Sequence, residues 1–99
     1  MIVAFVVGVG KKVEARSWAR IEDSTLAERG DGEAPTDPDV TFTATPADAQ
    51  ALHEGTLDLS VGFMRGQVKM AGDTGALLRF LPSTSGAEPA VRVADVLPS

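Results

Sequence analysis

Residues 40–81 read VTFTATPADAQALHEGTLDLSVGFMRGQVKMAGDTGALLRFL, and they contain most of the signals that decide the fold. The stretch opens on a strand at residues 40–44, where apolar side chains alternate with threonines. A helix is predicted from Pro46 to Glu54, because Thr45 is a good N-cap residue and proline is favoured at the first helical position. Gly55 is the residue type that commonly ends a helix.

The second half of this stretch continues with short helices and a strand. Residues 57–65 carry apolar side chains at helical spacing, and Gly66 ends that segment. Residues 67–71 predict a short strand, and Asp73 is the expected cap of a further helix. We expect this helix to end at Pro82, because proline lacks the backbone N–H that a helix interior requires. Its apolar side chains are Ala76, Leu77, Leu78, Phe80 and Leu81.

The first part of the chain predicts three more strands. Ile2–Val9 is almost continuously apolar and rich in valine, which favours a strand near the centre of a sheet. Lys12–Glu22 alternates small apolar residues with charged ones, so we expect a half-exposed antiparallel strand that forms a hairpin with the first. Thr25–Arg29 is a candidate edge strand, and residues 30–38 collect turn-forming residues and predict a loop.

This order of elements predicts an α+β fold: an antiparallel-rich sheet of roughly five strands with short helices packed on one face. The length of 99 residues suits a single domain over residues 1–99. Within it, residues 83–89 resemble a linker. Residues 90–99 form a short apolar tail that we expect to dock on the rest of the domain.

Composition excludes several classes of function. The chain has 14 acidic and 9 basic residues, and the basic ones are scattered, so nucleic acid is not an expected partner. The absence of cysteine excludes a disulfide framework and a thiolate metal site. The apolar residues 1–10 lack the features of a signal peptide, and no stretch is long enough for an integral membrane segment. A cytoplasmic protein is therefore expected.

The sequence gives only weak signals for a catalytic or metal-binding site. His53 is the only histidine, and at a helix end beside Glu54 it has no second histidine to complete a metal site or a catalytic triad. The four carboxylates Asp31, Glu33, Asp37 and Asp39 fit no calcium-loop spacing and are expected in a solvated turn. The sequence therefore predicts no catalytic residue, no metal, no cofactor and no enzymatic activity.

Trp18 lies on the charged side of its predicted strand, where a tryptophan is unusual. One interpretation is that the stems of neighbouring arginines or the C-terminal segment cover it. The other is that Trp18 marks a subunit interface, so a homodimer is a possible assembly.

The ordered pattern from Val40 onward resembles the sterol carrier protein type 2 family. Residues 63–69 (FMRGQVK), followed by Gly72-Asp73, match the family's aromatic-methionine pair, its x-G-x-[VL]-K motif and its G-D before an apolar helix. The resemblance implies non-catalytic binding of a fatty acid, acyl chain or sterol in a tunnel between sheet and helices. Members of this family usually begin with a helix or two that cover the sheet, whereas Met1 here almost directly precedes a strand. We expect that helix to be lost, or to be replaced by the C-terminal segment or a partner subunit.

Two interpretations of the large apolar residues stay open. As a lipid pocket, the expected lining is Phe42, Leu59, Phe63, Met64, Met70, Leu77, Leu78 and Leu81. Alternatively these side chains fill an ordinary core, because a domain this small needs most of its large apolar residues for packing. In that case the chain would be an interaction or structural module, acting as a homodimer or as the accessory subunit of an enzyme.

Overall fold

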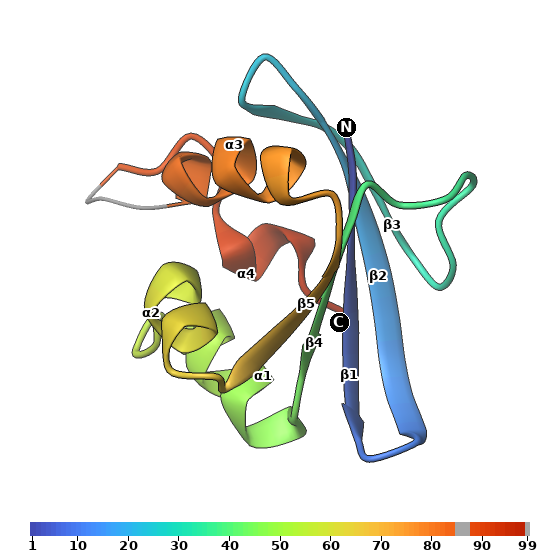
Figure 1. The fold of residues 1–99 in the computed structure, drawn as a ribbon, viewed down its shortest axis with the longest axis vertical. Helices are drawn as coiled ribbons and strands as arrows, with labels where there is room; N and C mark the ends of the chain where they lie inside the picture. Colours follow the sequence, from blue (N-terminus) through green and yellow to red (C-terminus); the bar gives the residue numbers. More distant parts are fainter. Residues whose placement is uncertain (85–87, 99) are drawn as a thin grey trace.

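The computed structural model describes residues 1–84 and 88–98, and it contains a five-stranded mixed sheet (Figure 1). The strands follow the order β3-β2-β1-β4-β5, so β1 is central as predicted. β1 is antiparallel to β2 and parallel to β4, and the other neighbouring strands are antiparallel. The bounds are β1 Ile2–Val9, β2 Lys12–Glu22, β3 Thr25–Asp31, β4 Val40–Ala44 and β5 Val68–Gly72.

The helices gather on one face of this sheet, while the loop between β3 and β4 extends on the other side (Figure 1). This arrangement confirms the predicted α+β class with an antiparallel-rich sheet. Among the described residues, no helix is long and apolar enough to cross a membrane. The helices are α1 Pro46–Glu54, α2 Leu59–Met64, α3 Thr74–Thr84 and α4 Val93–Val96.

The predicted helix signals at the ends of α1 are confirmed. The side chain of Thr45 accepts a hydrogen bond from the backbone N–H of Asp48, with 3.3 Å between the two atoms. At the other end, Gly55 adopts a left-handed conformation with φ of 82°, and its N–H bonds back to carbonyls of the last turn. The Asp73 carboxylate likewise accepts from the N–H of Gly75 at 2.8 Å, near the start of α3.

The prediction that Pro82 ends the third helix is wrong, because α3 runs through Pro82 to Thr84. Proline removes the hydrogen bond to the carbonyl of Leu78, four residues earlier. Both Pro82 and Leu78 lie on the exposed side of α3, where water can serve that carbonyl. The helix therefore includes residues 83 and 84 of the predicted linker 83–89, of which residues 85–87 lie outside the described structure.

The core between the sheet and the helices is built around three aromatic rings in mutual contact, of which Phe5 and Phe42 are stacked. The ring centroids of Phe5 and Phe42 are 5.3 Å apart, and those of Phe42 and Phe80 are 5.8 Å apart. Each of these side chains is at most 2% exposed. Two sheet strands and α3 thus meet on one tightly packed apolar cluster.

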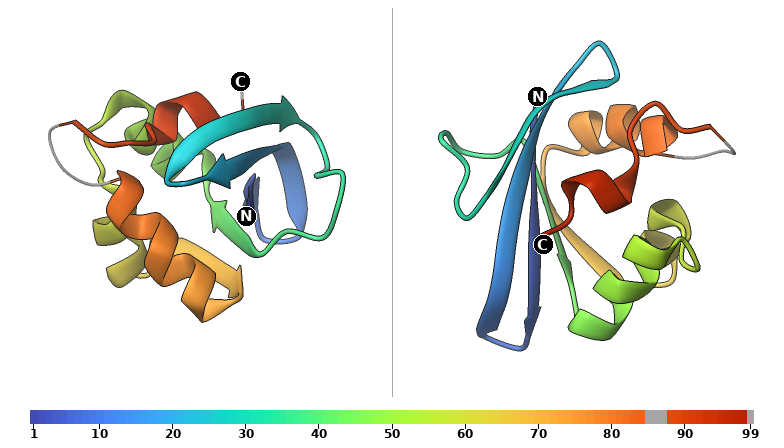
Figure 2. Two further views of the ribbon diagram at one scale, coloured as in Figure 1. Left: turned by 90° about the horizontal axis from the view of Figure 1, so that it is seen from above. Right: turned by 180° about the vertical axis from the view of Figure 1, so that it is seen from behind.

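The C-terminal segment, residues 88–98, packs against the same face of the sheet as the other helices (Figure 2). Val91, Val96 and Leu97 are buried in the core. This segment does not cover Trp18, because it bonds to the neighbouring Ser17, whose side chain points to the opposite face of β2. Trp18 instead packs across Gly30 of β3, its partner in the β2–β3 ladder.

Candidate functional site

A groove of about 590 Å³ lies between α1, the ends of β1 and β2, and the C-terminal segment. We call it the α1 groove. Most of its wall is apolar, and this lining is interrupted by a few polar side chains at its edges. Its lining residues are Val7, Ala15, Arg29, Pro46, Ala49, Gln50, His53, Ala94, Asp95, Leu97 and Pro98.

The periodicity of α1 explains one wall of the groove. Pro46, Ala49, Gln50 and His53 are spaced by three, four and seven residues, which places them on one side of the helix. The opposite wall comes from Val7 of β1 and its β2 partner Ala15. The space remains open because alanines stand at three of the lining positions, where larger side chains would fill it.

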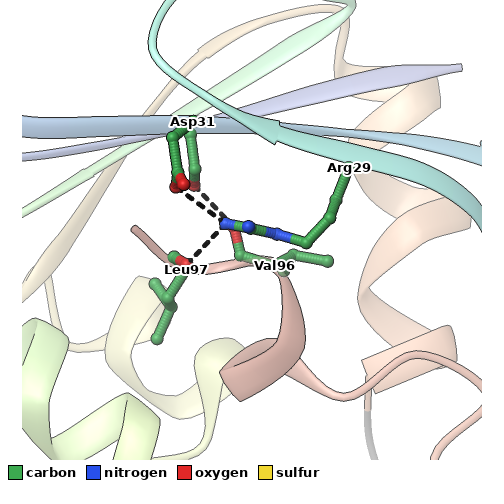
Figure 3. A network of polar contacts seen from close by, with 5 residues as sticks. Arg29, Asp31, Val96 and Leu97 are labelled. Carbon is green, nitrogen blue, oxygen red and sulfur yellow. Dashed lines mark hydrogen bonds and ion pairs between the residues drawn. The ribbon is translucent and has the colours of Figure 1, made fainter. Parts of the chain in front are cut away.

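The C-terminal segment forms one side of the groove, and Arg29 bonds to this segment (Figure 3). The Nη2 atom of Arg29 donates to the carbonyl oxygen of Leu97 and to Oδ1 of Asp31, each at 3.0 Å. Nε of the same guanidinium is buried and has no hydrogen-bond partner among the described residues. Arg29 therefore joins β3, the tail and the groove wall.

Two further cavities flank this site. One, of about 400 Å³, lies on the other side of α4 and shares His53 and Ala94 with the α1 groove. The other, of about 410 Å³, lies on the opposite face of the sheet beneath residues 32–38. Of these three cavities, the α1 groove has the largest volume.

The structure separates the eight residues predicted to line a pocket into three groups. Phe42, Leu59 and Leu77 are at most 3% exposed and belong to the core. Met64 and Leu78 are 81% and 66% exposed and lie outside the core. The partly buried Phe63, Met70 and Leu81 pack against the core.

These positions leave the predicted lipid pocket without a direct test. Of the eight residues, Leu59 lines the 400 Å³ cavity, and the other seven line none of the three cavities described here. Their role in ligand binding stays a prediction.

The polar residues that the sequence singled out are dispersed. His53 is exposed at the end of α1, on the rim of two cavities. In the acidic loop, Glu33 pairs with Arg16 at 3.1 Å, and Asp39 accepts from the N–H of Ile2 at 2.8 Å. Among the described residues, no group of three or more histidine, cysteine or acidic side chains is placed to hold a metal ion.

Sequence reasoning missed most of the α1 groove. The sequence predicts that the tail docks, but not where. Val7, Ala15 and Arg29, which line the groove together with the tail, come from three different strands, and they lie near one another only because β1, β2 and β3 are neighbours in the sheet. The spacing of Pro46, Ala49 and His53 on α1 was the available signal, since none of the three carries a large aliphatic or aromatic hydrocarbon side chain that would fill the groove.

Comparison with known proteins places the chain in a family. The model of the SCP-2 sterol transfer family matches residues 20–82. None of the curated proteins matches the chain at a significant level.

Solved structures show the same fold at low sequence identity. Sterol carrier protein 2-like 2 from Aedes aegypti is 18% identical with a TM-score of 0.61, and the match covers 81% of this chain and 69% of that one. A structure of the palmitated form of that protein gives 17% identity and a TM-score of 0.59, with 81% and 68% covered. A stereoselective inverting sec-alkylsulfatase from Pseudomonas sp. is 22% identical with a TM-score of 0.56, over 82% of this chain and 12% of that one. The present chain thus spans about two thirds of the carrier protein and a small part of the sulfatase.

Proposed function

The chain belongs to the SCP-2 sterol transfer family, and we propose that it binds and carries an apolar lipid in the α1 groove without catalysing a reaction. The observation that supports this proposal is a groove with mostly apolar walls at the junction of the sheet, α1 and the C-terminal segment. We further propose that residues 1–99 act together as one lipid-binding domain, since the groove draws on both ends of the chain.

The size and lining of the groove suit such a ligand. Small-molecule sites in proteins are typically about 300–1,000 Å³ and are lined mainly by apolar side chains. The α1 groove, at about 590 Å³, falls within that range. Burial of apolar surface contributes about 25 cal/mol per Å², so a hydrocarbon chain needs no special chemical group to bind there.

A fatty acyl chain is the first ligand to try. One structural relative, the carrier protein from Aedes aegypti, has a palmitated form. The identity with that protein is only 17%, so palmitate enters here as a probe for this chain. A sterol is the second probe, because the family's description names sterol transfer.

The tunnel between sheet and helices is the finer version of this proposal. In this version, the eight predicted residues would contact the ligand, and these contacts would replace some of the contacts that the residues now make with the core. Because Phe42, Leu59 and Leu77 fill the core, this tunnel requires the helices to move away from the sheet when ligand enters. The α1 groove requires no such movement.

Native mass spectrometry of the purified protein, with extraction of bound lipid and titration with palmitate, tests the proposal. We expect one lipid per chain in the wild type. Ala49→Trp should fill the groove and weaken palmitate binding about tenfold or more. Ala47→Trp is the matched control, because Ala47 is exposed on the same helix and lies outside the groove lining.

Each result has a definite meaning. Unchanged palmitate binding by Ala49→Trp would move the site from the groove to the predicted tunnel. A wild-type protein that binds neither palmitate nor cholesterol would contradict lipid binding.

An interaction module is the alternative function. In this alternative the exposed Met64 and Leu78 would supply apolar contacts to a partner. An empty dimer in the same mass spectrum, converted to monomer by Met64→Ser with Leu78→Ser, would support this alternative.

A further inference from the structure

Arg29 stands out among the residues of the α1 groove because its hydrogen-bonding capacity is only partly used. A guanidinium has five N–H donors. Both hydrogen bonds of Arg29 use Nη2, which contacts Asp31 and Leu97. The buried Nε has no acceptor among the described residues. Nη1 has no hydrogen bond among the described residues either, so its two N–H groups are free for an added acceptor.

Part of the Arg29 side chain borders the groove, so a ligand in the groove can supply that acceptor. The side chain is 30% exposed and belongs to the groove lining. Val7, Ala15, Ala49 and other apolar residues form most of the remaining wall. Among the described lining residues, Arg29 is the only lysine or arginine. The groove thus combines an apolar wall with one permanent positive charge.

The carboxylates near Arg29 reduce the net positive charge at the site but leave some of its N–H donors unused. Asp31 takes one N–H of Nη2, and the other is directed to the Leu97 carbonyl. Asp95 also lines the groove, but it is exposed to solvent, where water and salt screen its charge. Gln50 and His53 complete the polar part of the lining.

We propose that Arg29 binds the headgroup of a single-chain anionic lipid whose hydrocarbon chain lies along the α1 groove. This inference rests on the proposed function and narrows its ligand class. The guanidinium gives charge-assisted hydrogen bonds to an anionic headgroup, and these are stronger than bonds to a neutral hydroxyl. The groove therefore selects a fatty acid over the alcohol of the same chain length.

The test compares palmitate with hexadecan-1-ol, because the two probes share a chain length and differ in their headgroup. We expect wild-type protein to bind palmitate about tenfold tighter or more in a direct calorimetric titration at about 0.15 M salt. Arg29→Met should abolish this preference and leave the affinity for hexadecan-1-ol within about threefold of wild type. Arg29→Lys keeps the charge and should keep part of the preference.

Arg16→Met is the matched control, because Arg16 also forms a carboxylate pair from the sheet but lies outside the groove lining. It should retain the wild-type preference. A wild-type protein that binds both probes equally would overturn the role of Arg29, and so would an Arg29→Met protein that still prefers palmitate. If Arg29→Met does not fold, the wild-type ratio and the Arg29→Lys protein decide. A protein that binds neither probe nor cholesterol contradicts the proposed function itself.

Discussion

The hydroxyl of Ser17 donates a hydrogen bond of 2.6 Å to the carbonyl oxygen of Val96, and the two residues are 79 positions apart in the chain. Both are buried, with exposures of 1% and 0%. Ser17 is the polar residue in a row of small side chains on the helix-facing side of β2. Its hydroxyl therefore gives the last helix a defined anchor on an otherwise apolar surface.

Ser17→Ala should lower the free energy of unfolding by about 1–3 kcal/mol, because the buried carbonyl of Val96 loses its donor. Urea denaturation followed by circular dichroism measures the change. Thr36→Ala in the exposed loop is the control and should stay within about 0.5 kcal/mol of wild type. Equal stability of Ser17→Ala and wild type would show that the tail is held by apolar packing alone.

Gly30→Ala should displace the indole of Trp18. A Cβ atom added at Gly30 would lie 2.7 Å from the indole nitrogen, which is too close for a contact. The ring must then rotate toward solvent, and we expect a red shift of the fluorescence of this single tryptophan together with a loss of about 1 kcal/mol.

A double-mutant cycle separates this contact from a general effect on the strand. In a Trp18→Ala background the added methyl group at Gly30 has no ring to displace. The substitution should then be close to neutral. A similar loss of stability in both backgrounds would point to backbone strain in β3 as the cause.

The main features of the fold could be predicted because its signals are local. Alternating apolar residues in β4, the Thr45 cap and the Gly55 stop each depend on a few neighbouring residues, and the structure has all three. The parallel pairing of β1 with β4 could not be predicted from the alternation of apolar residues. A parallel and an antiparallel β4 would turn the same apolar face toward the core, so the alternation does not give the direction of the strand.

Leu77 and Leu78 are adjacent in sequence but lie on opposite sides of α3. Leu77 is 3% exposed and packs in the core, whereas Leu78 is 66% exposed. Leu77→Ala should cost about 2–5 kcal/mol of stability, and Leu78→Ala should cost less than about 0.5 kcal/mol. Thermal unfolding of the two variants side by side measures the difference. Comparable losses would mean that a partner or a second copy covers Leu78 in solution.

The candidate site was harder to predict than the fold because it depends on tertiary contacts. The sequence offered large apolar residues such as Phe42 and Leu77 as pocket lining, and the structure places them in the core. The α1 groove is open at small residues, such as Ala15 and Ala49, which carry little signal in a sequence. Arg29 joins it through a tertiary contact, the hydrogen bond of its side chain to the carbonyl oxygen of Leu97.

Pro82→Ala should stabilise the protein. Pro82 is exposed within the last turn of α3, and it has no N–H to donate to the carbonyl of Leu78 four residues earlier. Alanine restores that N–H and has a higher helix propensity, although the unfolded chain gains about 0.4–1 kcal/mol of conformational freedom when proline is removed. The net gain should be about 1–2 kcal/mol, measured as a rise in Tm.

Arg79→Ala tests whether this gain comes from the hydrogen bond. Arg79 is exposed on the same helix and keeps its backbone N–H, so alanine there should leave the Tm nearly unchanged. A lower Tm for Pro82→Ala than for wild type would mean that the rigid ring stabilises the protein, by restricting the unfolded chain, more than a complete helix would.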